Sequence, residues 1–300
     1  MLEQPLVSVI INCFNGQRYL KDAVNSVIGQ TYKNWEIIFW DNQSTDKSAE
    51  IFKSYNNKRL KYFLAPTHSN ILYKARNSAL EKASGEFIAF LDVDDWWLSE
   101  KLEKQIPLFK NSEIGLVYGN CWMFFENKNK KIIYRKKNLP SGMVLNELLN
   151  DYCIASPTYV IRKNFLENLE YKFNNNFHII GDFDLNIRLE TKHKFYCIQT
   201  PVANVRIHHS NESLLNRNKE ISELKIWYKE MKKNSIISAQ AKLKQIPLMT
   251  SYLEIMQSIL VDKFAQSFSS VMKYPFSFRK IKLIIALVLP KFILKKIKNY

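Results

Sequence analysis

Short apolar runs alternate with segments of helical periodicity along the first third of the chain. The runs at 7–11, 35–40, 60–64 and 87–91 are short and rich in β-branched or aromatic residues, which predicts four strands. Apolar residues recur at helical spacing over 18–31, 47–55 and 73–82, which predicts helices between them. This alternation predicts an α/β fold with a mostly parallel sheet covered on both faces.

The pattern is less regular after residue 101. A strand is expected at 114–118, a hairpin with arms at 121–126 and 131–135, and a helix from 184 to 190. From about residue 216 the chain turns Lys-rich with helical spacing.

Composition narrows the class of protein. A hydrophobic fraction of 46% and an aromatic fraction of 13% predict a large core and exclude a disordered chain. The four Cys form no Cys-x-x-Cys pair, so we expect reduced thiols in a cytosolic protein. The first apolar run is broken by Ser8 and has no basic segment before it, so it is expected to be a strand and not a signal peptide.

The net charge of +16 is concentrated at one end. Residues 261–300 hold nine Lys/Arg and a single Asp262, which accounts for half of the excess. A nucleic-acid-binding main domain is therefore not favoured.

Carboxylates follow the fourth predicted strand directly. Asp92, Asp94 and Asp95 come after a buried run, where their mutual repulsion is costly unless a cation offsets it. Mg²⁺ or Mn²⁺ prefers such oxygen ligands, together with substrate phosphates. The alternative is a solvated Asp-rich turn that caps the next helix.

Polar residues also follow the first and second predicted strands, at Asn12–Asn15 and Asp41. In open α/β sheets ligands bind beyond the carboxyl ends of the strands, so these residues are expected to meet the Asp92–Asp94 cluster. Asp182 stands at a Gly-containing turn before a predicted helix. It is either a site carboxylate or a helix N-cap.

Ordered segments resemble family two glycosyltransferases, the inverting type with the GT-A fold. They are VSVIINCFNG (7–16), WEIIFWDNQSTD (35–46), ARN (75–77), GEFIAFLDVDD (85–95) and KLE (101–103). The likeness thins after about residue 120 and returns at 181–189 and 206–208. It implies a Rossmann-like, mostly parallel sheet of the GT-A nucleotide-diphospho-sugar transferase type with a helical C-terminal extension. Three regions are then expected: a nucleotide-sugar-binding half (1–105), an acceptor-binding half (106–215) and a basic helical region (216–300).

The resemblance also implies roles for individual residues. Asp94 matches the direct Mn²⁺ or Mg²⁺ ligand, Asp182 the general base, and His208 a contact to the diphosphate or metal. The nucleotide-binding residues that it implies are Asn12, Phe14, Asn15, Asp41, Arg76 and Asp92. His208 could instead be an exposed loop histidine, and Arg76, Arg188 and Arg206 are either phosphate partners or structural, the latter favoured for the last two.

Three departures from the family pattern concern the same site. The common Asp-Asp-Gly-Ser-Thr-Asp is here Asp-Asn-Gln-Ser-Thr-Asp (41–46). Ile-Leu-Tyr (71–73) stands where a Gly is frequent, and Gly181 precedes Asp182 where Glu is frequent. No required catalytic group is lost, but the first two departures leave the identity of the donor open.

The resemblance implies partners and a cellular location. We expect a nucleotide-diphosphate sugar donor, with a UDP-sugar preferred, and a glycan or lipid-linked glycan acceptor of cell-surface polysaccharide synthesis, and no nucleic acid. The end of the chain is an apolar stretch bracketed by cations. It is either an interfacial anchor on an anionic membrane surface, which would make the enzyme peripheral at the inner face of the membrane, or a helix docked on the core.

Two other functions remain open. A catalytically inactive GT-A-like protein could bind nucleic acid or an anionic surface, as the charge of +16 would allow. A nucleotidyltransferase should carry a glycine-rich basic loop after its first strand, and residues 12–16 are neither.

Overall fold

The computed structural model describes residues 4–261, 264–290 and 294. The chain divides into two compact units, Met1–Glu212 and Ser213–Tyr300, and each is described by itself. The expected finer division at residue 105 stays a prediction.

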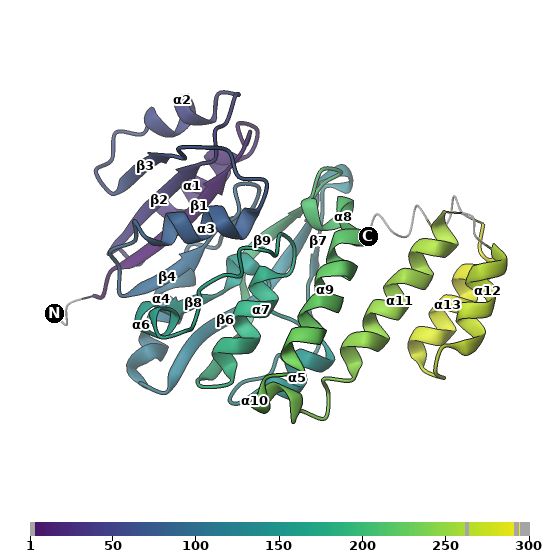
Figure 1. The fold of residues 1–300 in the computed structure, drawn as a ribbon. Coiled ribbons are helices and arrows are strands. Elements are labelled where there is room, and N and C mark those ends of the chain that lie inside the picture. Colours follow the sequence, from purple (N-terminus) through teal and green to yellow (C-terminus); the bar gives the residue numbers. More distant parts are fainter. Residues whose placement is uncertain (1–3, 262–263, 291–293, 295–300) are drawn as a thin grey trace. The chain divides into compact units, whose positions relative to one another are not determined.

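Four parallel strands form one half of the sheet in the first unit (Figure 1). They are β1 (Val7–Cys13), β2 (Trp35–Asp41), β3 (Leu60–Leu64) and β4 (Phe87–Phe90), in the order β3-β2-β1-β4. These are the four strands that the apolar runs predict. Because the strands are parallel, their carboxyl ends lie at one edge of the sheet.

The second half of the sheet is mixed. It continues through β8 (Val160–Arg162), β6 (Ile114–Phe125), β9 (Lys194–Ile207) and β5 (Trp96–Trp97), and β7 (Lys130–Ile133) pairs with β6. The expected strand at 114–118 and the first hairpin arm at 121–126 are one continuous strand, β6. Gly119 and Asn120 interrupt the apolar pattern but stay in the strand, because buried Asn120 donates to the Arg135 carbonyl and the register to β9 shifts there.

Helices cover both faces of the parallel strands. The helices of this unit are α1 (Leu20–Ile28), α2 (Ser48–Lys53), α3 (Leu72–Leu80), α4 (Lys101–Gln105), α5 (Leu145–Asn150), α6 (Lys163–Glu167) and α7 (Gly181–Glu190). Helix α1 buries its apolar side in a core cluster with alternate residues of the strands, Val9 and Ala89 among them. Phe90 lies on the opposite face of β4, where the Arg76 guanidinium of α3 is 5.1 Å from its ring.

The second unit is helical, as expected from residue 216 onward. After α8 (Glu212–Leu215) come α9 (Arg217–Met231), α10 (Ser235–Ser238), α11 (Gln245–Leu260), α12 (Phe264–Lys273) and α13 (Phe278–Val288). Its small core is formed by Ile255, Ile259, Val271, Tyr274, Leu283, Ala286 and Leu294. Among the described helices, none combines the length and the apolar composition that a bilayer span needs.

Candidate active site

A buried arginine joins two of the carboxylates that the sequence singles out. Arg76, on α3, is 2% exposed. Its Nη1 donates to both oxygens of Asp182 at 2.9 Å, and its Nη2 donates to Asp92 Oδ1 at 2.5 Å and to Ser156 Oγ at 3.1 Å. Asp92, which the resemblance assigns to nucleotide binding, and Asp182, which it assigns to the acceptor hydroxyl, therefore share one guanidinium. A buried guanidinium of this kind stabilises both carboxylates through charge-assisted hydrogen bonds, with one positive charge shared between them.

Two tyrosines complete the surroundings of Asp182. The Tyr73 hydroxyl donates to Asp182 Oδ2 at 3.0 Å and the Tyr159 hydroxyl donates to Oδ1 at 2.5 Å. Asp182 lies in the first turn of α7 and is not its N-cap, which is Ile180. The carboxylate keeps 14% of its surface exposed, so a small group can still reach it.

Gly181 is required by the ring of Tyr73. A Cβ at position 181 would lie 2.3 Å from Cδ2 of Tyr73, a separation that real side chains do not adopt. The departure at Ile-Leu-Tyr (71–73) and the departure at Gly181 therefore meet in one contact. The tyrosine occupies the space that a side chain at 181 would need, and it places its hydroxyl on the candidate base.

A second cluster surrounds Asp94, two residues beyond Asp92. His208 Nε2 lies 2.9 Å from Asp94 Oδ2, and Asn211 Nδ2 donates to the same oxygen at 3.2 Å. The His208 side chain is 6% exposed, so the exposed-loop alternative for this residue does not hold. The structure brings Asp94 and His208 together, although 114 residues separate them in the chain.

Asp95 and Arg206 fix the backbone beneath this cluster. Asp95 is 4% exposed and accepts from the Arg206 backbone N–H at 2.8 Å, so this carboxylate is not solvated, and the next helix, α4, has Glu100 and not Asp95 as its N-cap. Burial raises the pKa of Asp95 well above its usual range, and the charges of Asp94 and Asp92 add to the effect. Arg206 donates to the Asp94 carbonyl and to Asp22, which supports its structural role. Arg188 pairs with Asp184 and is structural as well.

Asp41 holds together the loop that follows β2. It is 1% exposed, its Oδ1 accepts from the Ser44 backbone N–H at 2.8 Å, and its Oδ2 accepts from the Tyr62 hydroxyl at 2.7 Å. Both oxygens are thus already hydrogen-bonded inside the protein. Its predicted contact with a nucleotide base stays a prediction. The neighbouring Gln43 takes a left-handed φ of 67° where the family often has Gly.

An exposed aromatic pair lies beside this loop. Phe14 is 51% exposed and its ring centroid is 4.4 Å from that of His68, whose Nδ1 lies 2.9 Å from the Asn42 carbonyl. The pair presents flat rings to solvent, on which a base can stack. The side-chain amide of Asn12 is buried and has no hydrogen-bond partner among the described residues. Asn15 takes φ 54° and its Oδ1 accepts from the Thr45 N–H.

The residues around Asp94 fit a divalent cation only in part. Within the described ranges, no three His, Cys, Asp or Glu side chains are grouped so that they could hold a metal ion by themselves. Asp94 and His208 supply a carboxylate and an imidazole, both of which bind Mn²⁺-type ions. Such ions commonly take their remaining ligands from water and substrate phosphates, so the donor set fits a metal that arrives with a diphosphate.

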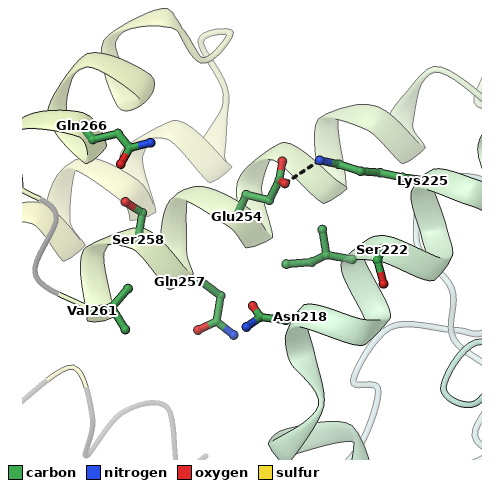
Figure 2. Close-up of a pocket in the computed structure, with 9 residues that line it drawn as sticks. Asn218, Ser222, Lys225, Glu254, Gln257, Ser258, Val261 and Gln266 are labelled. Atoms are coloured by element: carbon green, nitrogen blue, oxygen red, sulfur yellow. Dashed lines mark hydrogen bonds and ion pairs between the residues drawn. The ribbon is translucent and has the colours of Figure 1, made fainter.

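A separate groove of about 450 Å³ lies in the second unit, lined by α9, α11 and the start of α12 (Figure 2). The Lys225–Glu254 ion pair, 2.5 Å long, borders it. Asn218 and Gln257 point toward each other across it in Figure 2. None of the candidate site residues lines this groove, so it does not bear on the acidic edge of the sheet.

A sheet with parallel strands and an Asp-x-Asp pair at their carboxyl edge is what the resemblance to GT-A transferases predicts. Residues 8–188 match the profile described as "Glycosyl transferase family 2". The chain belongs to this family.

Curated relatives include enzymes of surface polysaccharide synthesis. The chain is 34% identical over 172 residues to the Escherichia coli UDP-Glc:alpha-D-GlcNAc-diphosphoundecaprenol beta-1,3-glucosyltransferase WfgD. The matched region is 57% of this chain and 66% of WfgD. It is 42% identical over 105 residues to the putative teichuronic acid biosynthesis glycosyltransferase TuaG of Bacillus subtilis, covering 34% of this chain and 41% of TuaG. The chain thus spans less than two thirds of these relatives.

Solved structures share the fold. S. aureus TarS 1-349 in complex with UDP-GlcNAc superposes with a TM-score of 0.64 at 17% identity, covering 98% of this chain and 89% of that one. The mannosyltransferase PcManGT from Pyrobaculum calidifontis, in complex with GDP-Man and Mn²⁺, superposes with a TM-score of 0.65 at 14% identity. The superposition covers 100% of this chain and 85% of PcManGT. At these identities the likeness establishes the GT-A fold alone.

Proposed function

We propose that this protein is an inverting glycosyltransferase that moves a sugar from a nucleotide-diphosphate donor to a lipid-linked glycan acceptor in cell-surface polysaccharide synthesis. One observation carries the proposal: Arg76 bridges Asp92 and Asp182, so the donor-side carboxylate and the candidate base lie on either side of one guanidinium. The family and the curated relatives support the same chemistry.

The donor binds at the carboxyl edge of β1, β2 and β4. The exposed Phe14–His68 pair offers a stacking surface for the base. The buried side-chain amide of Asn12, which has no hydrogen-bond partner among the described residues, is assigned to the same site. We propose a UDP-sugar, since WfgD is named for UDP-Glc and the TarS structure is a complex with UDP-GlcNAc. We assign Asn15, Asp41, Arg76 and Asp92 to the same donor site.

Departure of the nucleoside diphosphate leaves negative charge that must be stabilised. Asp94 and His208 would hold Mn²⁺ or Mg²⁺, which supplies Lewis-acid stabilisation of that charge. Asp182 takes the proton of the attacking acceptor hydroxyl as the new bond forms at the anomeric carbon. For this it must exchange the donated hydrogen bond of Tyr73 or Tyr159 for one from the acceptor, and Arg76 keeps the carboxylate in place during that exchange.

The relatives support an acceptor class and a place of action. WfgD, by its name, acts on GlcNAc-diphosphoundecaprenol, a sugar carried by a membrane lipid. We propose an acceptor of the same class, which places the enzyme in the cytoplasm, peripheral at the inner face of the membrane.

The test begins with thermal-shift binding of UDP, GDP, CDP and dTDP, with and without Mn²⁺. We expect a Mn²⁺-dependent stabilisation by UDP, about 2.7 kcal/mol at a ligand concentration a hundredfold above Kd. It should be lost in Asp94→Ala and kept in Glu113→Ala, a control at an exposed carboxylate paired with Lys194. Transfer from UDP-sugars to a polyprenyl-diphosphate-GlcNAc acceptor is then followed by mass spectrometry.

Each outcome separates one part of the proposal from another. A shift with GDP alone would replace the donor but leave the enzyme class intact. Binding without transfer to the lipid-linked acceptor would contradict the acceptor class. No shift with any nucleotide, together with salt-dependent binding to duplex DNA, would favour the inactive, anion-binding alternative that the +16 charge allows.

A further inference from the structure

Helix α13 has two apolar faces. Leu283 and Ala286 point into the small core of the second unit and are buried. On the other side, apolar residues recur at three- and four-residue spacing and remain exposed: Phe278, Ile281, Ile285 and Val288. Residues at this spacing share one face of a helix. Phe278 is 71% exposed and Val288 is 77% exposed, so within the described part of the chain this face is open to solvent.

The apolar surface extends beyond α13. Phe276, in the turn before the helix, is 86% exposed. On α12, Phe268 and Met272 are one turn apart and exposed, whereas Ser267 and Val271 are buried. We call the surface formed by the exposed residues of both helices and the turn the α12–α13 face; its members are Phe268, Met272, Phe276, Phe278, Ile281, Ile284, Ile285 and Val288. Surfaces of this kind mark interaction sites on soluble proteins.

The charged residues on the two helices and the turn that form this face have one sign. Residues 264–290 contain four Lys/Arg and no Asp or Glu. At about 100° per residue, Lys280 and Lys282 fall on opposite sides of the apolar stripe of α13. Lys282 is exposed and its Nζ lies 4.9 Å from the Phe278 ring. An apolar stripe with cations along both edges suits a partner surface that offers apolar groups beneath a layer of anionic groups. A second copy of the same face would bring like charges together.

We propose that the α12–α13 face docks on the surface of an anionic lipid bilayer, with the helices in the plane of the interface and Phe276 and Phe278 in the acyl boundary. Helices that lie in the membrane plane combine an apolar face with Lys/Arg beside it, and each basic residue adds attraction to anionic lipid. The two alternatives for the basic end of the chain then describe different faces of one helix: α13 packs on its own unit through Leu283 and Ala286 and meets the membrane with the other side.

This inference rests on residues 264–290 and is independent of the proposed transferase chemistry. Its test uses the full chain and vesicles of phosphatidylcholine alone or of an equimolar mixture with phosphatidylglycerol. We expect flotation with the mixed vesicles, weakened by high salt, and little with phosphatidylcholine alone. Phe276→Ser combined with Phe278→Ser should lower the partition coefficient by ~100-fold or more.

Matched controls keep the result specific. Ile226→Ser combined with Ile236→Ser removes two exposed apolar side chains from α9 and α10 and should float like the wild type. Thermal unfolding of each variant confirms that it is folded, and UDP binding should be unchanged in both. The six Trp residues all lie outside 264–290, so Phe276→Trp adds a reporter to this region that should be quenched by brominated lipid, unlike Ile236→Trp.

Three results would overturn the proposal. One is equal flotation of wild type and the Phe276→Ser, Phe278→Ser variant. Another is binding that does not depend on phosphatidylglycerol. The third is a concentration-dependent dimer, seen by sedimentation without lipid and abolished by the same variant, which would assign the face to self-association. A chain that floats as expected but transfers no sugar would contradict the proposed function and leave this inference standing.

Discussion

Asp182 and Asp94 are carboxylates of one site in very different surroundings. Asp182 receives hydrogen bonds from a buried guanidinium and two phenols, so its charge is offset inside the folded chain. Asp94 faces an imidazole and an amide, and its side chain is more exposed, 23% against 14%. Both oxygens of Asp182 accept hydrogen bonds from protein groups, whereas His208 and Asn211 contact Asp94 at Oδ2, and the greater exposure of Asp94 leaves more room for a bound cation. Substitutions in the Asp182 cluster should therefore mainly affect turnover and stability, and substitutions in the Asp94 cluster should mainly affect Mn²⁺-dependent nucleotide binding.

Asp182→Asn should have the largest effect on turnover. The amide keeps the size of the side chain but cannot take a proton, so we expect transfer to fall by about 10²–10⁴-fold. Because the Asp94 cluster is untouched, Mn²⁺-dependent UDP binding should stay within a factor of a few. Steady-state kinetics and thermal shift measure the two effects. Wild-type turnover in this variant would remove Asp182 from the role of base.

Arg76→Met should have the largest effect on stability. It leaves the largely buried Asp182 without its cation, a change that costs about 3–5 kcal/mol, to which Asp92, 36% exposed, adds less. Urea unfolding measures it. Lys194→Met, which breaks the exposed pair with Glu113, is the control and should cost less than about 1 kcal/mol. Equal losses in the two variants would mean that the Arg76 cluster is not a buried ion network.

Glu190, at the other end of α7, shows what burial does without a cation. It is fully buried, Oε1 accepts from the Val144 N–H, and Oε2 has no hydrogen-bond partner among the residues described. Burial raises the pKa of Glu190 from 4.5 to about 7. The folded state thus retains a proton that the unfolded chain releases, so stability falls as the pH rises through this window.

Glu190→Gln should remove that part of the pH dependence. From a pKa difference of about 2.5 units, the wild type loses about 3 kcal/mol relative to the variant between about pH 4.5 and pH 8. Urea unfolding of both proteins at the two ends of this range gives the difference. Parallel stability curves for the two proteins would show that Glu190 is solvated or paired in solution.

His208→Gln tests whether the imidazole beside Asp94 takes part in Mn²⁺-dependent nucleotide binding. Loss of the imidazole should weaken UDP binding about 10-fold in the presence of Mn²⁺ and leave metal-free binding unchanged. Calorimetric titration of UDP with and without Mn²⁺ measures the metal-dependent and the metal-free affinity separately. His209→Gln is the neighbouring control at an exposed position. The same loss with and without Mn²⁺ would give His208 a purely structural role.

Tyr73→Phe should have the smallest effect. It removes one hydrogen bond to Asp182 and keeps the ring against Gly181, so unfolding should become easier by about 1 kcal/mol. Urea unfolding measures it. A loss as large as that of Arg76→Met would show that the phenol, and not the guanidinium, holds the carboxylate.

The parallel half of the sheet was predictable because its signal is local. Each of β1 to β4 is a short apolar run between helical segments, and its end is marked by a polar residue such as Asn12, Asp41 or Asp92. The convergence of these ends follows from parallel pairing. β6 was predicted as two pieces because Gly119 and Asn120 break its apolar pattern. Pairing with β9 and the hydrogen bond from Asn120 to the Arg135 carbonyl keep these residues in the strand.

The residues around the carboxylates were less predictable because they meet only in three dimensions. Tyr159 and Asn211 belong to no motif, and His68 lies in a loop without a recognisable pattern. Arg76 was singled out as a phosphate or structural partner, yet its contact with Asp182 spans 106 residues of chain. The one local signal for Tyr73 was its place in the Ile-Leu-Tyr departure from the family pattern, and the residue that it contacts, Gly181, belongs to a separate departure.

The contact between Tyr73 and Gly181 has a consequence for how this site can change by mutation. A Glu at 181 alone would force its Cβ into the ring of Tyr73. A small residue at 73 alone would leave a hole beside Gly181 and remove a hydroxyl from Asp182. The effects of substitutions at the two positions are therefore coupled, and a library that varies them independently would sample mostly damaged pockets.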